Sequence, residues 1–197
     1  MDTKTIDTYN QKAKKYDEET SDFWDKFPKT FLNKFANMVS RKILDVGSGP
    51  GRDGLILQNL GLDVICLDAS KAMIKFCQKR GLKTKLGDFD KIPFKDKYFD
   101  GVWAYTSLLH VKKSEIIKPL QEIKRVLKNN GIFGLGLIEG KTEEYRENIG
   151  KNMPRLFSYY SRKEIEKILA ENEFEILYFE IFKPKTRNYL NFIARKI

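Results

Sequence analysis

The chain has 197 residues, of which 41% are hydrophobic and 13% aromatic, so it can form one domain with a sizeable core and is not intrinsically disordered. The formal net charge of +10 leaves a nucleic-acid partner open, although the lysines are spread along the chain without a long basic run. No apolar stretch reaches transmembrane length and the polar start lacks a signal peptide, so we expect a cytoplasmic protein with no membrane segment.

The first 40 residues predict two helices. Tyr9, Ala13 and Tyr16 stand at i, i+4 and i+7 within residues 7–20, which places them on one face of a helix. A second helix is predicted over residues 28–39, with an apolar face that packs on the core. That face consists of Phe27, Phe31, Phe35 and Met38.

The next stretch predicts a strand, a glycine loop and the start of a helix. The apolar run at residues 43–46 is typical of a strand buried on both faces of a parallel sheet. Gly47, Gly49 and Gly51 follow, and glycine permits positive φ and lets backbone N–H groups approach a ligand closely. The helix that begins at Arg52 directs its positive end toward the same ligand.

Beyond this loop, strands and helices alternate with the spacing that is typical of βαβ units in a parallel sheet. Ser70 caps the second of these helices, and Gly61 and Gly81 end the first two. Strands are predicted at residues 62–68, 82–86, 99–105 and 132–138, and helices at 52–60, at 70–80 and from about 114 or 119 to 129.

Residues 140–160 interrupt the alternation with a polar segment that carries several tyrosines and arginines. An insertion at this point lies over the strand ends, as either a lid that selects the substrate or a surface excursion with a helical turn. A capping box formed by Ser161 and Glu164 then opens a helix that continues through Glu171. The last predicted strands are at residues 174–182 and 188–195.

The residues around the glycine loop carry a family pattern. Asp45 stands two residues before Gly47, and the third glycine comes one residue too early for a dinucleotide fingerprint. This D-x-G-x-G-x-G pattern resembles the signature of the class I S-adenosylmethionine-dependent methyltransferases, and similar segments continue in order from residue 41 to 138. One departure, Asn129-Asn130-Gly131 in place of the family's proline and paired glycines, falls in a turn remote from the cofactor. The resemblance implies an α/β fold, a Rossmann-like three-layer sandwich whose mostly parallel seven-stranded sheet has an antiparallel C-terminal strand.

The same resemblance implies which residues hold S-adenosylmethionine. Asp68 matches the family's acid for the ribose hydroxyls, and Asp88 matches a later acid that meets the adenine amino group. Tyr16 belongs to a Tyr-x-x-x-Ala-x-x-Tyr-Asp pattern whose helix closes over the cofactor, unless it simply packs on the core. Arg52 stands where several relatives place an arginine for the cofactor carboxylate, unless it is a surface residue. The remaining expected cofactor contacts are Asp45, Gly47, Gly49, Ala69, Met73, Phe89 and Ala104.

Displacement of a methyl group from a sulfonium depends mostly on alignment and dehydration, and a base is needed only if the nucleophile must lose a proton. His110, the lone histidine, follows the fourth strand, where related methyltransferases often carry a histidine near the methyl group. It is either that base or a loop histidine hydrogen-bonded to the backbone. The expected substrate contacts, each of which could instead be a packing or surface residue, are Tyr105, Glu139, Arg155, Tyr159 and Tyr160.

We therefore expect a single methyltransferase domain over residues 1–197 that acts on a small-molecule substrate. Cys66 and Cys77 lack zinc-ligand or disulfide spacing, so no metal is expected. An RNA or protein methyltransferase, or a non-catalytic protein that binds the S-adenosyl ligand, is the alternative, and the oligomeric state is open. The expected parts are an N-terminal helical lid (1–40), a cofactor-binding core (41–140), a cap insertion (141–160) and a C-terminal helix and strand pair (161–197).

Overall fold

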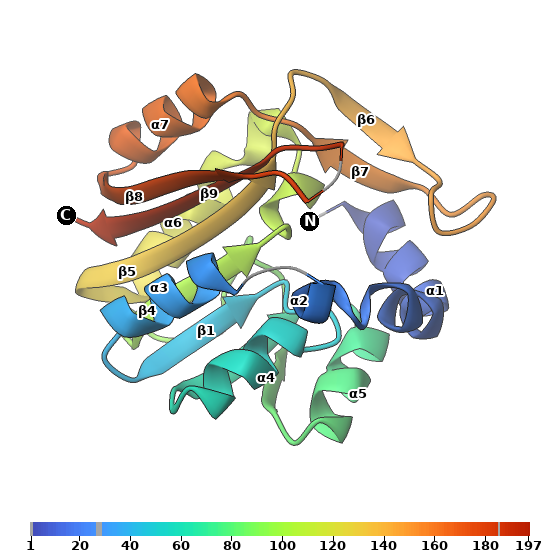
Figure 1. The fold of residues 1–197 in the computed structure, drawn as a ribbon, viewed down its shortest axis with the longest axis horizontal. Helices are drawn as coiled ribbons and strands as arrows, with labels where there is room; N and C mark the ends of the chain where they lie inside the picture. Colours follow the sequence, from blue (N-terminus) through green and yellow to red (C-terminus); the bar gives the residue numbers. More distant parts are fainter. Residues whose placement is uncertain (1, 27–28, 185) are drawn as a thin grey trace.

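The computed structural model describes residues 2–26, 29–184 and 186–197. Its centre is a seven-stranded sheet in the order β3-β2-β1-β4-β5-β9-β8 (Figure 1). The neighbours from β3 to β5 are parallel, and β9 is antiparallel to both β5 and β8, so the predicted fold class is confirmed. The strands of this sheet are β1 Lys42–Val46, β2 Asp63–Asp68, β3 Lys83–Leu86, β4 Phe99–Tyr105, β5 Leu127–Ile138, β8 Phe174–Phe182 and β9 Tyr189–Lys196; a separate pair comprises β6 Glu143–Arg146 and β7 Arg155–Ser158.

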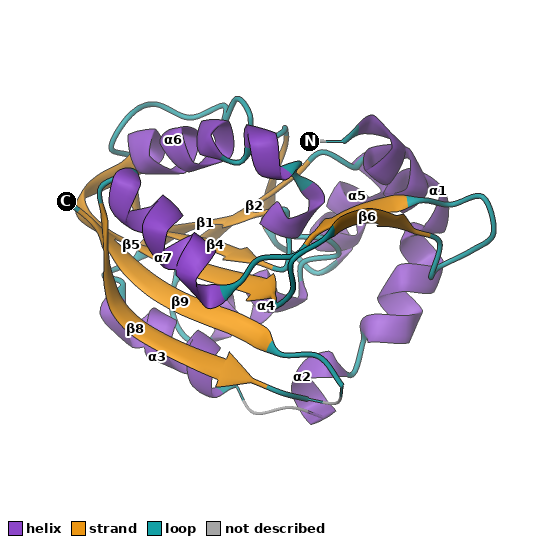
Figure 2. Ribbon diagram, turned by 90° about the horizontal axis from the view of Figure 1, so that it is seen from above, coloured by secondary structure: helices purple, strands orange, loops and turns teal. Residues whose placement is uncertain are grey.

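Helices cover both faces of the sheet, which gives three layers (Figure 2). On one face Ile123 of α6 and Leu169 of α7 belong to a core cluster with Phe133, while on the other Phe35 of α3 packs in a cluster with Trp103. No helix in the described ranges is both long and apolar enough to span a membrane. The helices are α1 Thr3–Thr20, α2 Phe23–Lys26, α3 Thr30–Met38, α4 Arg52–Asn59, α5 Lys71–Lys79, α6 Ile117–Val126 and α7 Arg162–Glu171, with short 3₁₀ turns η1 Leu108–His110 and η2 Lys113–Glu115.

The N-terminal helix starts earlier than its apolar face predicts. The Asp2 side chain accepts a hydrogen bond from the Thr5 N–H at 2.8 Å and caps the helix, so α1 begins at Thr3. The sequence patterns did not predict the short helix α2. The predicted start of the following helix at residue 28, together with Phe27, lies outside the described residues, and α3 is described from residue 30.

The insertion at residues 140–160 contains a β-hairpin, so the predicted helical turn is wrong. All four residues of β7 are buried, because the strand is fastened to α1. The Leu156 N–H donates to the Thr5 hydroxyl oxygen at 2.9 Å, and the Thr8 hydroxyl donates to the Pro154 carbonyl at 2.8 Å. Figure 1 shows the hairpin and α1 beyond the ends of the central strands, and β7 contacts α1, so the two segments predicted as lid and cap pack together.

Strand β5 begins at Leu127, where the sequence predicts a helix through residue 129. The pairing of β4 with β5 shifts register between Phe99 and Gly101, and Asn130 has a φ of +60°. A bulge of this kind takes up extra residues while the ladder continues. The Asn129-Asn130-Gly131 departure from the family pattern is therefore part of an irregular strand and not a simple turn.

Candidate functional site

A cavity of about 480 Å³ opens where the parallel strands end. Strand β1 lies between β2 and β4, so the chain leaves these strands in opposite directions, and in open α/β sheets ligands bind at such a switch point. One wall consists of the strand ends and the glycine loop, and the other of α1 and the hairpin. The lining residues include Asp45, Gly47, Gly49, Arg52, Asp53, Asp68, Met73, Phe89, Tyr105 and His110 on the first wall, and Tyr9, Tyr16, Asn148, Arg155 and Phe157 on the second.

The glycine loop is held in shape by backbone hydrogen bonds to the neighbouring strand. The N–H groups of Gly47 and Ser48 both donate to the Leu67 carbonyl, at 2.8 and 3.1 Å. Gly47 and Gly49 have φ values of +67° and +54°, which only glycine reaches without a steric penalty. A Cβ on Gly49 would have only the Tyr16 ring nearby, at 3.9 Å, so the loop presents bare backbone beside the cavity.

The Asp68 carboxylate is fixed by the loop beside it. The N–H of Gly49 donates to Oδ2 and the N–H of Ser70 donates to Oδ1, each at 2.8 Å. Burial raises the pKa of Asp68 to about 6, and the N–H groups offset only part of that rise. At neutral pH the group is a rigid carboxylate, and each oxygen keeps capacity for one more donor such as a ligand hydroxyl.

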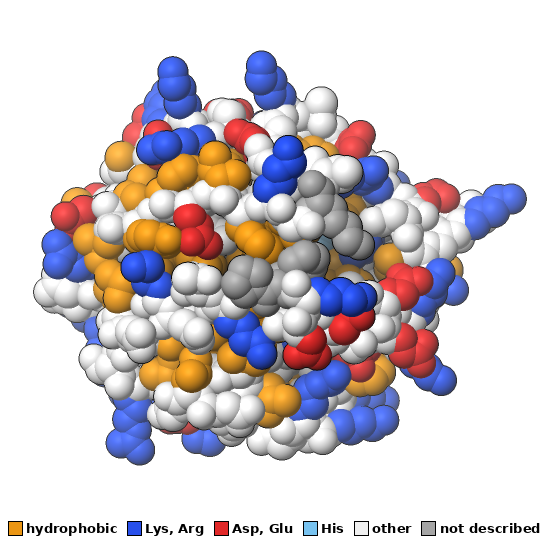
Figure 3. Space-filling model, viewed as in Figure 1, with side chains coloured by type: hydrophobic (Ala, Val, Ile, Leu, Met, Phe, Trp, Pro, Cys, Tyr) orange, Lys and Arg blue, Asp and Glu red, His pale blue; other side chains and the backbone are white. Residues whose placement is uncertain are grey.

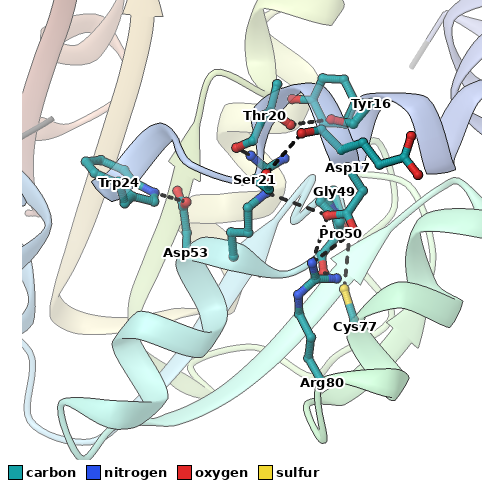
Figure 4. Close-up of polar contacts among 12 residues, drawn as sticks. Tyr16, Asp17, Thr20, Ser21, Trp24, Gly49, Pro50, Asp53, Cys77 and Arg80 are labelled. Atoms are coloured by element: carbon teal, nitrogen blue, oxygen red, sulfur yellow. Dashed lines mark hydrogen bonds and ion pairs between the residues drawn. The ribbon is translucent and has the colours of Figure 1, made fainter. Parts of the chain in front are cut away.

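Two further acids line the same cavity. Asp45 at the end of β1 is almost fully buried, and burial together with the neighbouring Asp53 raises its pKa well above the usual range. Asp53 accepts a hydrogen bond from the indole N–H of Trp24 at 2.5 Å (Figure 4). It accepts a second from the indole N–H of Trp103 at 2.8 Å, and burial raises its pKa as well. Sequence reasoning missed Asp53, because its two partners lie in distant segments and no local pattern links them to it.

Helix α1 is tied to the glycine-loop region by charged side chains (Figure 4). Arg80 donates to both carboxylate oxygens of Asp17, at 2.8 and 3.0 Å. The Arg52 guanidinium donates to the Thr20 carbonyl and lies 5.5 Å from the centre of the Tyr16 ring. These contacts hold Tyr16 over the loop, where it lines the cavity.

His110 has a hydrogen-bond partner on each ring nitrogen. Its Nδ1 lies 2.6 Å from the Leu156 carbonyl, which can only accept, so Nδ1 carries the proton. Its Nε2 lies 2.8 Å from the Tyr9 hydroxyl, and that hydroxyl oxygen accepts a hydrogen bond from Arg155 at 2.7 Å. Burial lowers the pKa of His110 to about 3, so the ring is neutral at pH 7 and its lone pair is already engaged. This arrangement argues against the expected role as a base and makes His110 the anchor that orients Tyr9.

The neutral, buried His110 makes stability depend on pH. Its pKa is depressed from 6.5 to about 3, so the unfolded chain binds a proton that the folded chain does not, and stability falls as the pH drops below 6.5. At pH 5 this loss is ~2 kcal/mol of unfolding free energy. We expect the variant His110→Gln to lose less unfolding free energy than the wild type between pH 7.5 and pH 5, measured by urea denaturation at each pH.

The comparison of the two pH dependences isolates His110. Asp68, with its pKa raised to about 6, contributes in the opposite sense, because the folded state binds its proton more tightly and gains stability as the pH falls. That contribution is present in both proteins and cancels in the difference. Parallel curves for the wild type and the variant would contradict the assignment of a neutral, buried histidine.

Most of the expected cofactor residues meet at the cavity, and three do not. Ala104 on β4 is fully buried because alternate residues of a strand face opposite sides, and its neighbours Trp103 and Tyr105 belong to the other core cluster. Ala69 and Asp88 stand next to lining positions without lining the cavity themselves. The expected residues that do line it are Tyr16, Asp45, Gly47, Gly49, Arg52, Asp68, Met73 and Phe89.

The expected substrate residues divide in the same way. Tyr105 and Arg155 line the cavity. Tyr159 is buried outside it, where its hydroxyl accepts hydrogen bonds from Arg146 at 3.0 Å and Arg187 at 3.2 Å. The two remaining residues, Glu139 and Tyr160, form an isolated bridge between β5 and α7 and do not line the cavity, so the structure does not place these three side chains at the site.

Comparison with known proteins gives a family for this architecture. A methyltransferase-domain family matches residues 44–135, which include the strand end, the glycine loop and Asp68. The chain is 38% identical over 105 residues to a sterol 24-C-methyltransferase of Gibberella zeae, covering 48% of this chain and 27% of the relative. It is 34% identical over 101 residues to the sarcosine/dimethylglycine N-methyltransferase of Aphanothece halophytica, covering 47% of this chain and 36% of the relative. The chain thus spans only about a quarter to a third of these curated relatives.

The fold is also shared with solved methyltransferases. The Burkholderia thailandensis 1,6-didemethyltoxoflavin-N1-methyltransferase, solved with S-adenosylhomocysteine, superimposes with a TM-score of 0.73 at 18% identity, over 96% of this chain and 87% of the other. At that identity the likeness shows the fold alone. Together with the domain match, it leads to one conclusion: residues 44–135 of this chain match a methyltransferase-domain family, within a fold that solved methyltransferases share.

Proposed function

We propose that this protein transfers a methyl group from S-adenosylmethionine to a small-molecule acceptor. The observation that carries the proposal is the cavity at the strand ends, where the bare glycine loop and the Asp68 carboxylate form one wall. When bound, the sulfonium of the cofactor supplies an electrophilic methyl group. The residues of the chain bind the two partners, align them and exclude water, which accounts for much of the rate of such a displacement.

The residues present fit the cofactor. The two Asp68 oxygens are held by N–H donors on one side and can accept two vicinal ribose hydroxyls on the other. Gly49 keeps the backbone free of a Cβ atom beside the cavity, where the cofactor would lie against it. Arg52, at the start of α4, has a buried Nε without a hydrogen-bond partner and suits the carboxylate of the cofactor's amino-acid end.

A small acceptor is favoured over a polynucleotide by the cover of the cavity and by the charge distribution. Helix α1 and β7 pack together and line the cavity opposite the strand ends, so they cover part of it. On the face shown in Figure 3, lysine and arginine side chains are scattered around the outline among acidic ones and do not gather in one patch. A nucleic-acid enzyme needs a continuous basic surface to track phosphates.

The proposal also assigns a role to the cover of the cavity, which consists of α1 and the β6–β7 hairpin: these elements act as the lid and cap of the domain. Tyr9, Tyr16 and Phe157 bring aromatic side chains from α1 and β7 to the cavity. Aromatic faces attract a sulfonium charge, and a closed cover strips water from the nucleophile. The bond from the Leu156 N–H to the Thr5 hydroxyl and the bond from the Thr8 hydroxyl to the Pro154 carbonyl tie β7 to α1, so opening is expected at the Asn148 end of the hairpin, away from these bonds.

The cofactor part of the proposal predicts one site per chain for S-adenosylmethionine and S-adenosylhomocysteine. Titration calorimetry with each ligand, and with NAD as the rival, measures the stoichiometry. Transfer is then tested with labelled S-adenosylmethionine and a panel of small amines, carboxylic acids and phenols, with total tRNA and a mixed protein fraction in parallel. NAD binding without S-adenosyl binding contradicts the cofactor, label in RNA or protein contradicts the small acceptor, and binding without any transfer supports a non-catalytic role.

A further inference from the structure

Arg155 is a buried cation that has no anionic partner. Its side chain lines the cavity from β7, and only 5% of the residue is exposed. One terminal nitrogen donates to the Tyr9 hydroxyl at 2.7 Å and the other donates to Asn148 Oδ1 at 2.6 Å. Its Nε is buried without a hydrogen-bond partner, and within the described ranges no carboxylate lies at ion-pair distance from the guanidinium.

The surroundings of Arg155 orient its charge without neutralising it. The rings of Tyr9, Tyr16 and Phe157 lie 5.2, 5.7 and 5.1 Å from the guanidinium carbon, so aromatic faces surround it. Such contacts offset part of the cost of burial, but a buried charge is normally paired with an opposite charge. The guanidinium has five N–H groups and two are used by the named partners, so three remain for a ligand.

Charge is distributed unevenly around the cavity. The acids Asp45, Asp53 and Asp68 all come from the wall of strand ends and the start of α4, which carries one cation, Arg52, among its named lining residues. Arg155 comes from the opposite wall, and Arg187, which also lines the cavity, comes from the segment before β9. An acceptor that enters between the hairpin and the strand ends therefore meets cationic groups on the side away from the proposed ribose contact.

We propose that Arg155 binds a carboxylate of the methyl acceptor, so that the substrates of this protein are small carboxylic acids; this rests on the proposed function. A guanidinium fork matches the two oxygens of a carboxylate, and one buried cation balances one negative charge. Arg52 lies on the glycine-loop side; its buried Nε has no hydrogen-bond partner, although Asp17 Oδ1 lies 3.9 Å away, so each of the two bound molecules has an arginine near its own carboxylate. Asn148 and Tyr9 fix the Arg155 fork before the acceptor arrives.

The test uses protein saturated with S-adenosylhomocysteine and pairs of probes that differ only in charge. Sarcosine is compared with sarcosinamide, 4-hydroxybenzoate with 4-hydroxybenzamide, and phenylacetate with phenylacetamide and benzylphosphonate, by titration calorimetry. We expect the carboxylate of at least one pair to bind about tenfold more tightly than its amide, the scale of a hydrogen-bonded charge pair. The preference is expected to disappear in Arg155→Met, to persist in part in Arg155→Lys, and to be unchanged in the control Arg162→Met, which removes an exposed arginine from α7.

Several results would overturn this assignment. Equal binding of carboxylates and amides by the wild type, or a phosphonate that outcompetes every carboxylate, rejects the carboxylate class. A preference that survives in Arg155→Met rejects the residue, and a large loss of S-adenosylhomocysteine affinity in that variant with the preference intact assigns Arg155 to the cofactor instead. If Arg155→Met does not fold, Arg155→Lys still tests whether the two-pronged guanidinium is needed, because it keeps the charge and loses the fork. Failure of the proposed function is distinct, because the wild type would then bind no S-adenosylhomocysteine at all.

Discussion

Replacement of Gly47 by alanine is expected to destabilise the protein by ~2–5 kcal/mol and to abolish S-adenosylhomocysteine binding. Two costs add at this position. The φ of +67° is unfavourable for any residue with a Cβ, and the new Cβ would lie 2.4 Å from the Ser107 Cβ. Ser107 cannot retreat easily, because it is buried and its hydroxyl donates to the Val46 carbonyl at 2.7 Å. Relief of the clash must move the glycine loop, which carries the N–H donor to Asp68.

Gly81→Ala provides a matched control for the backbone cost. Gly81 has a φ of +75°, and a Cβ there would meet nothing within 4 Å. We therefore expect only the conformational cost of ~1–2 kcal/mol and normal ligand affinity. Urea denaturation gives the free energies, and calorimetry gives the affinity. Equal losses in the two variants would show that the contact with Ser107 costs nothing, and unchanged ligand binding in Gly47→Ala would remove the loop from the site.

Asp68→Ala is expected to weaken S-adenosylhomocysteine binding by ~1.5–3 kcal/mol, the scale of hydrogen bonds to a charged acceptor. The carboxylate would accept from two ribose hydroxyls while it also fixes the N–H groups of Gly49 and Ser70. Part of this loss comes from looser positioning of the loop and not from the lost contact with the ribose. A second variant distinguishes these two causes. Asp68→Asn keeps an oxygen acceptor of similar shape and removes the charge, so it should recover part of the affinity.

The control for Asp68 is Asp63→Ala at the other end of β2. Asp63 pairs with Lys83 at 2.6 Å, near the surface and at the opposite end of the strand from the cavity. We expect no change in ligand affinity, because exposed ion pairs contribute little even to stability. Calorimetry on folded variants, checked by circular dichroism, measures all three. Normal affinity in a folded Asp68→Ala protein would rule out the ribose contact.

Local sequence patterns determined much of the scaffold. The capping box predicted at Ser161 and Glu164 is present, and the Ser70 hydroxyl accepts from the Met73 N–H as predicted for a helix cap. The strand predicted over 99–105 has those bounds in the structure. These features depend on residues a few positions apart, whose periodicity and capping chemistry act through nearest neighbours along the chain. The glycine loop belongs to the same class, because its three glycines are needed by the local backbone geometry.

The composition of the site was decided by tertiary structure. Asp53 has its role because Trp24 and Trp103, 29 and 50 positions away in sequence, direct their indole N–H groups at it. His110 has its Nε2 lone pair occupied because Tyr9, 101 positions away, lies within hydrogen-bond distance of it. The insertion gave no strand signal of its own, because β7 is buried throughout against α1 and η1 while its partner β6 is mostly exposed, so neither strand alternates. The sequence alone therefore determined the fold class and pointed to the acid at residue 68, which lines the cavity. The partners of each buried polar group follow from packing between distant segments, which local periodicity does not encode.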